Sequence, residues 1–342
     1  MNSKSRILLI YTGGTIGMMK DYKTGALKAF DFNKLLANVP ELSQLSCAIE
    51  TITFSTPIDS SNMNPEYWKV LATIIEKNYI EFDGFVVLHG SDTMSYTASA
   101  MSFMLENLLK PVIFTGSQLP IGDLRTDAKE NLITSIQIAS LKEEGVSPIN
   151  EVCLYFEYKL YRANRTTKIN AEHFEAFASL NYSPLAESGV HLKLNYENLL
   201  PKPKIKKLLV HKNLDNRIMV LKLFPGIAKN VVESVFSISD LKAVILESYG
   251  SGNAPTDKWF LNALNNAIKK EILIINVTQC SGGAVSLGQY ETSAHLKAMG
   301  VISGKDITTE AAIAKTMYLL GANVSKKVFK TIFETSLRGE ML

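Results

Sequence analysis

The hydrophobic positions of this 342-residue chain alternate between short apolar runs and longer amphipathic stretches. Short apolar runs bounded by glycine, proline or polar residues are typical of buried strands, and a 3.6-residue period is typical of helices. In the first half, strands are expected at 6–11, 84–88, 111–115 and 152–156, and helices at 93–109, at 126–142 and after Asn64, where Pro65 stands in the first turn. Such alternation predicts a mainly parallel sheet covered by helices.

The periodicity fades at 191–213, a stretch with prolines and lysines that we interpret as a linker. It then resumes, with strands expected at 218–224, 243–246 and 272–277 and helices at 228–236, 256–270 and 309–320. The predicted fold class is therefore α/β, with two α/β domains built on mainly parallel sheets. The larger N-terminal catalytic domain is expected at 1–190 and a smaller, flavodoxin-like C-terminal domain at 214–342.

Composition narrows the class of protein. A hydrophobic content of 46% is ordinary for a globular protein, and a net charge of +3 from scattered lysines and arginines does not favour a nucleic-acid partner. The sequence contains no run of about 18 apolar residues that would predict a membrane span, and its first apolar run is too short for a signal peptide. The three cysteines, Cys47, Cys153 and Cys280, are far apart, which favours a reducing compartment over a disulfide framework or a zinc site. We expect a cytoplasmic protein.

Several predicted strands end in side chains that carry a hydroxyl or another polar group. Because ligands bind at the carboxyl ends of parallel strands, these side chains together predict one polar pocket. The side chains are Thr12 and Thr15 after the first strand, Ser91 and Asp92 after the second, and Thr115, Ser117 and Gln118 after the third. Two simpler interpretations are open. The glycines beside Thr15 could form only a tight turn, and Asp92 or Thr93 could cap the next helix.

The residue types limit the chemistry of such a pocket. The five histidines lack metal-ligand spacing, and the sequence has no G-x-S-x-G elbow of a Ser-His-Asp hydrolase. What remains is a Thr or Ser nucleophile with a base other than histidine. A buried lysine can fill that role because desolvation lowers the pKa of an amine. We expect no metal and no cofactor.

Six motifs together resemble the bacterial-type L-asparaginases, and most closely their cytoplasmic type I branch, over essentially the full length. They are YTGGTIGM at 11–18, DSS at 59–61, HGSDTM at 89–94, TGSQ at 115–118, RANRTTK at 162–168 and YGSGNAP at 249–255. The resemblance implies hydrolysis of the side-chain amide of L-asparagine to L-aspartate and ammonia, with weak activity on glutamine as a further option.

The resemblance also implies roles for individual residues. Thr15 would be the nucleophile that forms an acyl-enzyme, and Lys168 would act as a base through Ser91. Asp92 would bind the substrate ammonium, and the head group would be held by Asp59, Ser60 and Ser61. This chain has Ser91 where most members have threonine, which keeps the hydroxyl but loses the methyl group that fixes the rotamer.

The resemblance also bears on the tyrosine that would activate Thr15 and on the assembly of subunits. Many members place a tyrosine directly after a glycine beyond the first motif, but here Ala26 follows Gly25 and Tyr22 is out of register. Tyr290 resembles a tyrosine that type I members carry in the C-terminal domain, and we expect it to supply the phenol. The resemblance further implies a homodimer or a dimer of dimers, with Asn253 reaching a neighbouring subunit's site.

Two other functions compete with hydrolysis of asparagine. One is the ammonia-generating subunit of a tRNA-dependent amidotransferase, which the early position of Thr15 disfavours because that subunit carries an extra N-terminal domain. The other is a sensor that binds asparagine without turnover. A pure sensor does not need two hydroxyls and a lysine, so the set of Thr15, Ser91, Asp92 and Lys168 favours the enzyme.

Overall fold

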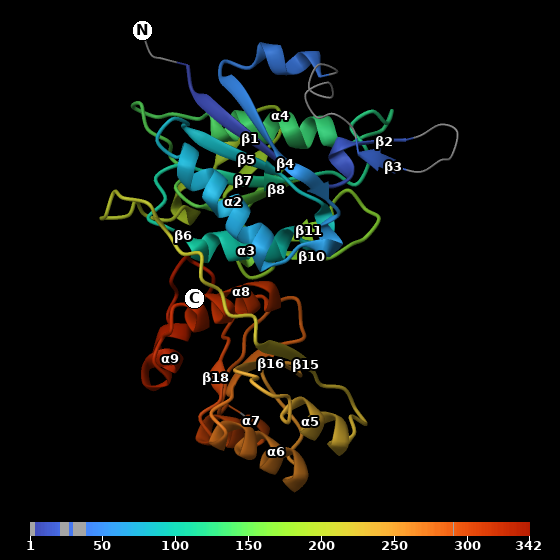
Figure 1. The fold of residues 1–342 in the computed structure, drawn as a ribbon, viewed down its shortest axis with the longest axis vertical. Helices are drawn as coiled ribbons and strands as arrows, with labels where there is room; N and C mark the ends of the chain where they lie inside the picture. The colour runs from blue at the N-terminus through green and yellow to red at the C-terminus, as the bar shows by residue number, and fades with distance from the viewer. Residues whose placement is uncertain (1–3, 21–26, 30–38, 290) are drawn as a thin grey trace. The chain divides into compact units, whose positions relative to one another are not determined.

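The structure is a computed structural model that describes residues 4–20, 27–29, 39–289 and 291–342. The chain divides into two compact units, Met1–Lys212 and Asn213–Leu342 (Figure 1). Each unit contains its own parallel or mainly parallel sheet and its own hydrophobic core. The prediction of two α/β units with mainly parallel sheets is therefore confirmed.

The first unit is built on an eight-stranded sheet in the order β13-β12-β9-β8-β7-β5-β1-β4. The five neighbouring strands from β8 to β4 run parallel, and β9, β12 and β13 pair antiparallel. The parallel strands therefore end at one edge of the sheet. The strands are β1 (Arg6–Gly13), β4 (Ala48–Ile58), β5 (Gly84–Leu88), β7 (Val112–Thr115), β8 (Val152–Phe156), β9 (Lys159–Arg162), β12 (Ala186–Ser188) and β13 (Leu192–Leu194).

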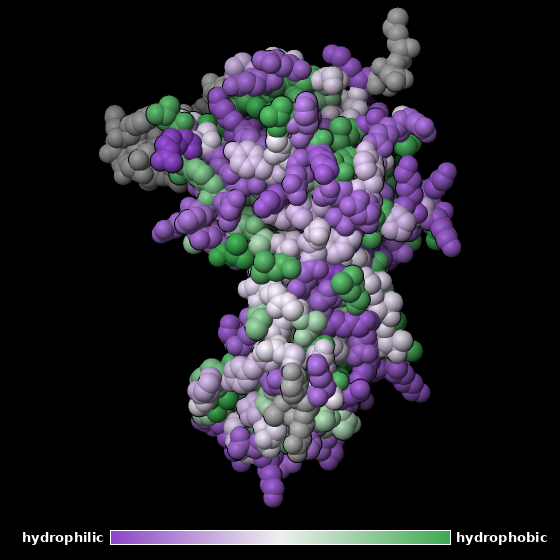
Figure 2. All heavy atoms as spheres, turned by 180° about the vertical axis from the view of Figure 1, so that it is seen from behind, coloured by the Kyte–Doolittle hydropathy of each residue, from purple (hydrophilic) through white to green (hydrophobic). Residues whose placement is uncertain are grey.

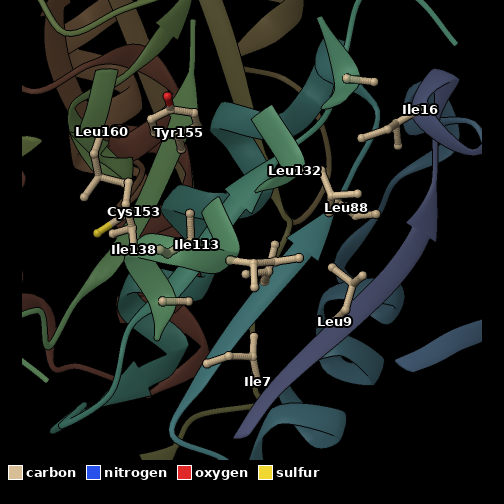
Figure 3. Close-up of a cluster of buried hydrophobic side chains, with 14 of the residues drawn as sticks. Ile7, Leu9, Ile16, Leu88, Ile113, Leu132, Ile138, Cys153, Tyr155 and Leu160 are labelled. Atoms are coloured by element: carbon tan, nitrogen blue, oxygen red, sulfur yellow. The ribbon is translucent and has the colours of Figure 1, made fainter. Parts of the chain in front are cut away.

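Helices cover both faces of this sheet, with α4 (Ala128–Ala139) on one face and α2 (Pro65–Asn78) and α3 (Met94–Met104) on the other (Figure 1). Figure 3 shows the core under α4, where alternate residues of each strand, such as Ile7 and Leu9, point toward Leu132. Because side chains alternate across a strand, burial on both faces requires continuous apolar runs. The helix α2 begins as predicted, since the Asn64 side chain accepts bonds from the N–H groups of Glu66 and Tyr67.

Short elements complete the first unit. They are the hairpin of β2 (Met18–Lys20) and β3 (Leu27–Ala29), the pair of β10 (Thr167–Lys168) and β11 (Phe177–Ala178), the pair of β6 (Leu105–Glu106) and β14 (Leu209–Val210), and the single turns η1 (Thr15–Gly17), η2 (Pro40–Gln44), η3 (Ser60–Asn62), η4 (Ser91–Thr93), η5 (Ala163–Arg165) and η6 (Tyr196–Asn198).

Two segments for which an element or a linker was expected differ from that expectation. The helix expected at 93–109 ends at Met104, and the chain continues into β6. The stretch 191–213, interpreted as a linker, supplies β13, η6 and β14, and the first unit extends to Lys212. The strands β6, β13 and β14 contain only two or three residues each, which is too short to show the two-residue hydrophobic period of a strand.

The second unit is a four-stranded parallel sheet in the order β15-β16-β17-β18. Figure 1 shows α5, α6 and α7 on one side of it and α8 on the other. Its core includes Phe260 and Leu264 of α6. The elements are β15 (Ile218–Lys222), α5 (Lys229–Val235), β16 (Ala243–Ser248), α6 (Lys258–Lys269), β17 (Leu273–Thr278), α7 (Glu291–Ala298), β18 (Ile302–Ser303), α8 (Thr309–Gly321) and α9 (Lys326–Phe333).

The surface is mixed in character. The face drawn in Figure 2 carries hydrophilic side chains with smaller hydrophobic patches between them. Single apolar side chains such as Ile80, Leu124 and Val190 are almost fully exposed, as is common on protein surfaces. Across the described residues, every helix is too short or too polar to cross a lipid bilayer.

Candidate functional site

Four loops meet at the carboxyl ends of the parallel strands in the first unit. They follow β1, β4, β5 and β7, which are neighbours in the sheet. The loop after β1 carries Thr15, the loop after β4 carries the DSS motif, and the loop after β5 carries Ser91 and Asp92. The loop after β7 carries Gln118. This is the edge at which parallel α/β sheets place their ligands.

Two glycines allow the first three loops to pack against one another. Gly14 has φ of +94°, and a Cβ atom there would lie 2.6 Å from both Cα and N of Gly90. A Cβ atom on Gly90 would lie 2.5 Å from the Ser60 Oγ. Only residues without side chains permit such approach. The neighbours of these glycines, Thr15 and Ser91, are thereby carried on two backbones in direct contact.

Lys168 lies at the centre of a three-residue polar group. Its Nζ is 2.9 Å from the Ser91 Oγ and 2.6 Å from an Asp92 carboxylate oxygen. The Lys168 side chain is only 18% exposed, whereas that of Asp92 is 66% exposed. Lys168 is therefore not a solvated surface lysine, and the Asp92 carboxylate is accessible to a ligand.

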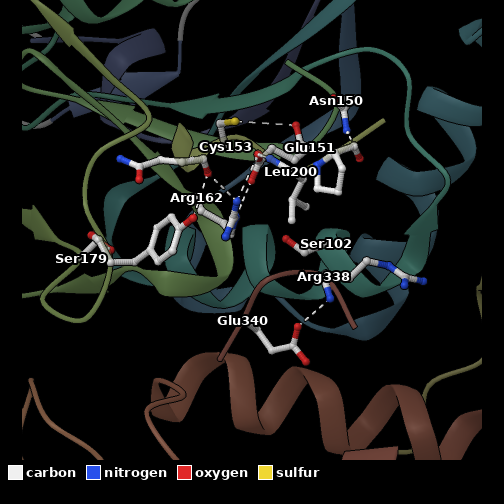
Figure 4. Close-up of polar contacts among 12 residues, drawn as sticks. Ser102, Asn150, Glu151, Cys153, Arg162, Ser179, Leu200, Arg338 and Glu340 are labelled. Atoms are coloured by element: carbon white, nitrogen blue, oxygen red, sulfur yellow. Dashed lines mark hydrogen bonds and ion pairs between the residues drawn. The ribbon is translucent and has the colours of Figure 1, made fainter. Parts of the chain in front are cut away.

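The RANRTTK segment holds Lys168 through buried contacts. Figure 4 shows the Arg162 guanidinium against the Glu151 carboxylate, with Nε 2.6 Å from Oε2 and both side chains buried. In the turn that follows, the Thr166 hydroxyl is 3.1 Å from the Ser95 hydroxyl of α3 and donates to the Ala163 carbonyl. The strand β10 then pairs with β11. Lys168 is thus fixed from both sides along the chain.

The DSS motif forms a capped turn after β4. The Asp59 carboxylate accepts bonds from the Ser61 N–H at 2.9 Å and the Ser61 hydroxyl at 2.8 Å, and these bonds lower the Asp59 pKa. The Ser60 carbonyl accepts a 2.7 Å bond from the Thr93 hydroxyl, which joins this turn to the loop of Ser91. Thr93 occupies the cap position of α3 without capping it through its side chain.

Not every hydroxyl at the strand ends faces the pocket. Thr12 donates to the Leu88 carbonyl, Thr115 donates to the Tyr155 carbonyl, and Ser117 donates to the Leu119 carbonyl. Thr12 and Thr115 are buried and link neighbouring strands. Of the polar residues predicted after the third strand, only Gln118 contacts the Lys168 group, through a 3.1 Å bond from the Ser91 hydroxyl.

Buried groups below the loops are held in their neutral forms. His89 is fully buried, which lowers its pKa to about 4, and its Nδ1 is 2.7 Å from the Gly90 carbonyl oxygen. Since a carbonyl can only accept, Nδ1 carries the proton. Burial also raises the Tyr11 pKa to about 12, and its hydroxyl lies under the turn of Gly14. These side chains support the loops.

Comparisons with known proteins agree with this architecture. Residues 6–200 match the family described as "Asparaginase, N-terminal", and residues 217–333 match the family "Glutaminase/Asparaginase C-terminal domain". The chain belongs to the asparaginase family. L-asparaginase 1 of Escherichia coli K12 is 44% identical over 340 residues, which cover 99% of this chain and 98% of that protein.

Two further relatives show to which kind of protein the chain is more similar. The crystal structure of L-asparaginase I from Vibrio cholerae superposes with a TM-score of 0.91 at 40% identity, covering 99% of this chain and 100% of that one. A glutamyl-tRNA(Gln) amidotransferase subunit from Methanococcus maripaludis is 32% identical over 348 residues, covering 98% of this chain and 80% of that protein. The chain is thus more similar to the two asparaginases than to the amidotransferase protein.

Three further residues were predicted for the site of this asparaginase-family chain: Tyr22, Tyr290 and Asn253. Tyr22 and Tyr290 lie outside the described residues. Asn253 belongs to the second unit, in a turn closed by reciprocal backbone bonds with Tyr249. One residue near the site escaped the sequence analysis. Asp127 accepts bonds from the N–H groups of Gln118 and Leu119.

Gly14→Ala is expected to reduce both stability and the proposed asparaginase activity. The added Cβ atom would meet the Gly90 backbone, and alanine at positive φ costs about 1–3 kcal/mol. A displacement of roughly 1 Å at a site costs on the order of 10²-fold in rate. Urea unfolding and ammonia release would measure the two effects. Gly122→Ala is the matched control, because open space surrounds Gly122. Equal behaviour of the two variants would contradict the argument from close approach.

Proposed function

We propose that this protein is an L-asparagine amidohydrolase that converts L-asparagine to L-aspartate and ammonia. The observation that carries the proposal is the contact of the mostly buried Lys168 amine with the Ser91 hydroxyl at 2.9 Å, beside an exposed Asp92 carboxylate. A hydroxyl next to a lysine is an arrangement for moving protons. Membership of the asparaginase family and 44% identity to an L-asparaginase support the choice of substrate.

In the first step, the Thr15 hydroxyl attacks the carbon of the side-chain amide, and the C–N bond breaks. Ammonia leaves with the proton from Thr15, and an ester joins Thr15 to the aspartyl group. In the second step, water attacks this ester while its proton passes through the Ser91 hydroxyl to the Lys168 amine. Lys168 returns this proton, through Ser91, to the Thr15 oxygen as aspartate leaves, which restores the enzyme.

Charge complementarity supports the proposed binding of the amino-acid head group. The exposed Asp92 carboxylate would attract and orient the α-ammonium group of the substrate. Asp59, Ser60 and Ser61 would hold the rest of the head group, with the Ser60 hydroxyl donating to the α-carboxylate. The Asp59 turn is already closed by the two bonds from Ser61, so little ordering would be needed on binding.

Backbone N–H groups would stabilise the oxyanion that forms at the amide carbon. The Gly90 carbonyl accepts a bond from the buried His89. Because N–H and C=O point in opposite directions across a trans peptide, the Ser91 N–H is directed away from His89. A donor aimed at a developing oxyanion contributes about 3–4 kcal/mol to transition-state stabilisation. His89 would therefore orient one such donor.

Several finer assignments complete the proposal. Tyr290, from the C-terminal part of the chain, would supply the phenol that activates Thr15, with Tyr22 as the alternative. The subunits would assemble as a homodimer or a dimer of dimers in which Asn253 reaches a neighbouring subunit's site. A cytoplasmic location is supported by the three cysteines, all of which are free.

The first test is the release of ammonia and aspartate from L-asparagine by the purified protein. We expect turnover of L-asparagine and slower release from L-glutamine, because one methylene group in a small pocket is worth about 1–3 kcal/mol. A protein that binds L-asparagine in calorimetry but releases no ammonia would instead be a sensor. Ammonia released from glutamine in clear preference to asparagine would favour the role of an amidotransferase subunit.

A further inference from the structure

The Gln118 side chain connects Ser91 to the segment that follows Lys168, and the catalytic roles proposed above do not use it. Its Oε1 accepts a bond from the Ser91 hydroxyl at 3.1 Å. Its Nε2 donates to the backbone carbonyls of Ala171 at 3.1 Å and His173 at 3.0 Å. One amide therefore contacts both sides of the Ser91–Lys168 pair.

The two carbonyls settle the orientation of the amide. Carbonyl oxygens can only accept hydrogen bonds, so the nitrogen of Gln118 must face Ala171 and His173, and its oxygen must face Ser91. Ser91 has a single hydroxyl proton. With that proton donated to Gln118, the Ser91 oxygen is free to accept from the Lys168 amine, which is the 2.9 Å contact observed.

The other end of the amide restrains Lys168 through the backbone. Ala171 and His173 lie in a turn directly after β10, the strand that ends at Lys168. Within this turn, the Asn170 side chain accepts bonds from the N–H groups of Glu172 at 2.8 Å and His173 at 2.9 Å. Since the turn is compact, tying it to Gln118 also limits movement of the Lys168 backbone.

Gln118 is itself held by a buried carboxylate. The two Asp127 oxygens accept bonds from the Gln118 N–H at 2.9 Å and the Leu119 N–H at 3.1 Å. Asp127 is buried at the start of α4, where its side chain turns back to the loop instead of capping the helix. The Gln118 backbone is therefore anchored to a helix of the core.

We propose that Gln118 is a positioning residue that fixes the Ser91 rotamer in place of the methyl group that a threonine would supply. A serine side chain rotates more freely about χ1 than a β-branched one. The bond to Gln118 holds the Ser91 oxygen within reach of Lys168. The bonds from the Gln118 amide to Ala171 and His173 restrain the backbone that carries Lys168, so that its amine stays beside Ser91. This role rests on the proposed function, because it keeps the Ser91 oxygen in contact with Lys168, and the Ser91 hydroxyl proton then has only to turn from Gln118 to Lys168 for the proposed transfer.

The test is a double-mutant cycle in the full-length protein, with L-asparagine as substrate. We expect Gln118→Met to lower kcat on the order of 10²-fold, as a loss of alignment does, while KM stays within about threefold because Gln118 does not contact the head group. In the Ser91→Thr background the penalty for Gln118→Met should shrink to less than about tenfold, because the added methyl group fixes the rotamer. Gln137→Met, on the exposed face of α4, is the matched control.

A second variant keeps the proposal testable if Gln118→Met unfolds. Gln118→Glu has the same shape, but its ionised carboxylate repels the carbonyls of Ala171 and His173, so kcat relative to wild type should fall as pH rises above about 4.3. The proposal would be overturned if Gln118→Met lowered kcat equally in the wild-type and Ser91→Thr backgrounds, or if it changed only KM. It would also be overturned if the ratio of the Gln118→Glu kcat to the wild-type kcat did not change with pH. A wild-type protein without asparaginase activity would refute the proposed function instead.

Discussion

Replacing Thr15 with alanine is expected to abolish ammonia release from L-asparagine, with kcat falling by at least roughly 10⁴-fold. The physical reason is that alanine has no oxygen with which to form the acyl-enzyme, while the rest of the site stays in place. The proposed head-group binding through Asp59 and Asp92 does not involve Thr15, so calorimetry should still detect L-aspartate with the variant. Steady-state ammonia release would measure the loss.

Thr15→Ser is the control that separates chemistry from structure. It keeps the hydroxyl and removes one methyl group, so a substantial part of the activity should return. If Thr15→Ala retained turnover close to wild type, Thr15 would not be the nucleophile and another hydroxyl of the site would have to take that role. If both variants were inactive and failed to bind L-aspartate, the cause would be a damaged loop.

The fold was most predictable where strands are fully buried. The segments 84–88 and 152–156 form β5 and β8 with the expected bounds, because an uninterrupted apolar run can only be buried on both faces. The strand β4 was not predicted, since its many exposed polar side chains hide the period. The helix expected to reach residue 109 was too long because Leu105 and Leu108 stay buried after the helix ends.

The candidate site was predictable in its residues but not in their orientations. A hydroxyl at a strand end can face the pocket or the next strand, and nothing in the local hydrophobic pattern distinguishes Ser91 from Thr12 or Thr115, whose hydroxyls bond the neighbouring strands. Asp127 was missed because it lies inside a predicted helix. Its bonds to Gln118 and Leu119 depend on tertiary contact with a loop, which local pattern does not encode.

Removal of the proposed base, Lys168→Met, is expected to lower kcat for L-asparagine by about 10²–10⁴-fold, the usual contribution of a positioned acid or base. Methionine matches the length of lysine but can neither accept a proton nor bond the Ser91 hydroxyl. Without that bond, the Ser91 hydroxyl has no group to which it can pass the proton from water. Steady-state kinetics would measure kcat, and Lys193→Met provides a matched lysine at an exposed position of β13.

Lys168→Arg decides whether the amine acts as a base or only as a positive charge. An arginine keeps the charge beside the Asp92 carboxylate but stays protonated at every accessible pH, so it cannot take a proton from Ser91. We therefore expect Lys168→Arg to be nearly as inactive as Lys168→Met. Activity near that of the wild type in Lys168→Arg would show that Lys168 only orients Asp92 and Ser91. The base would then have to be sought elsewhere in the site, because the proton from water must still be accepted before aspartate can leave.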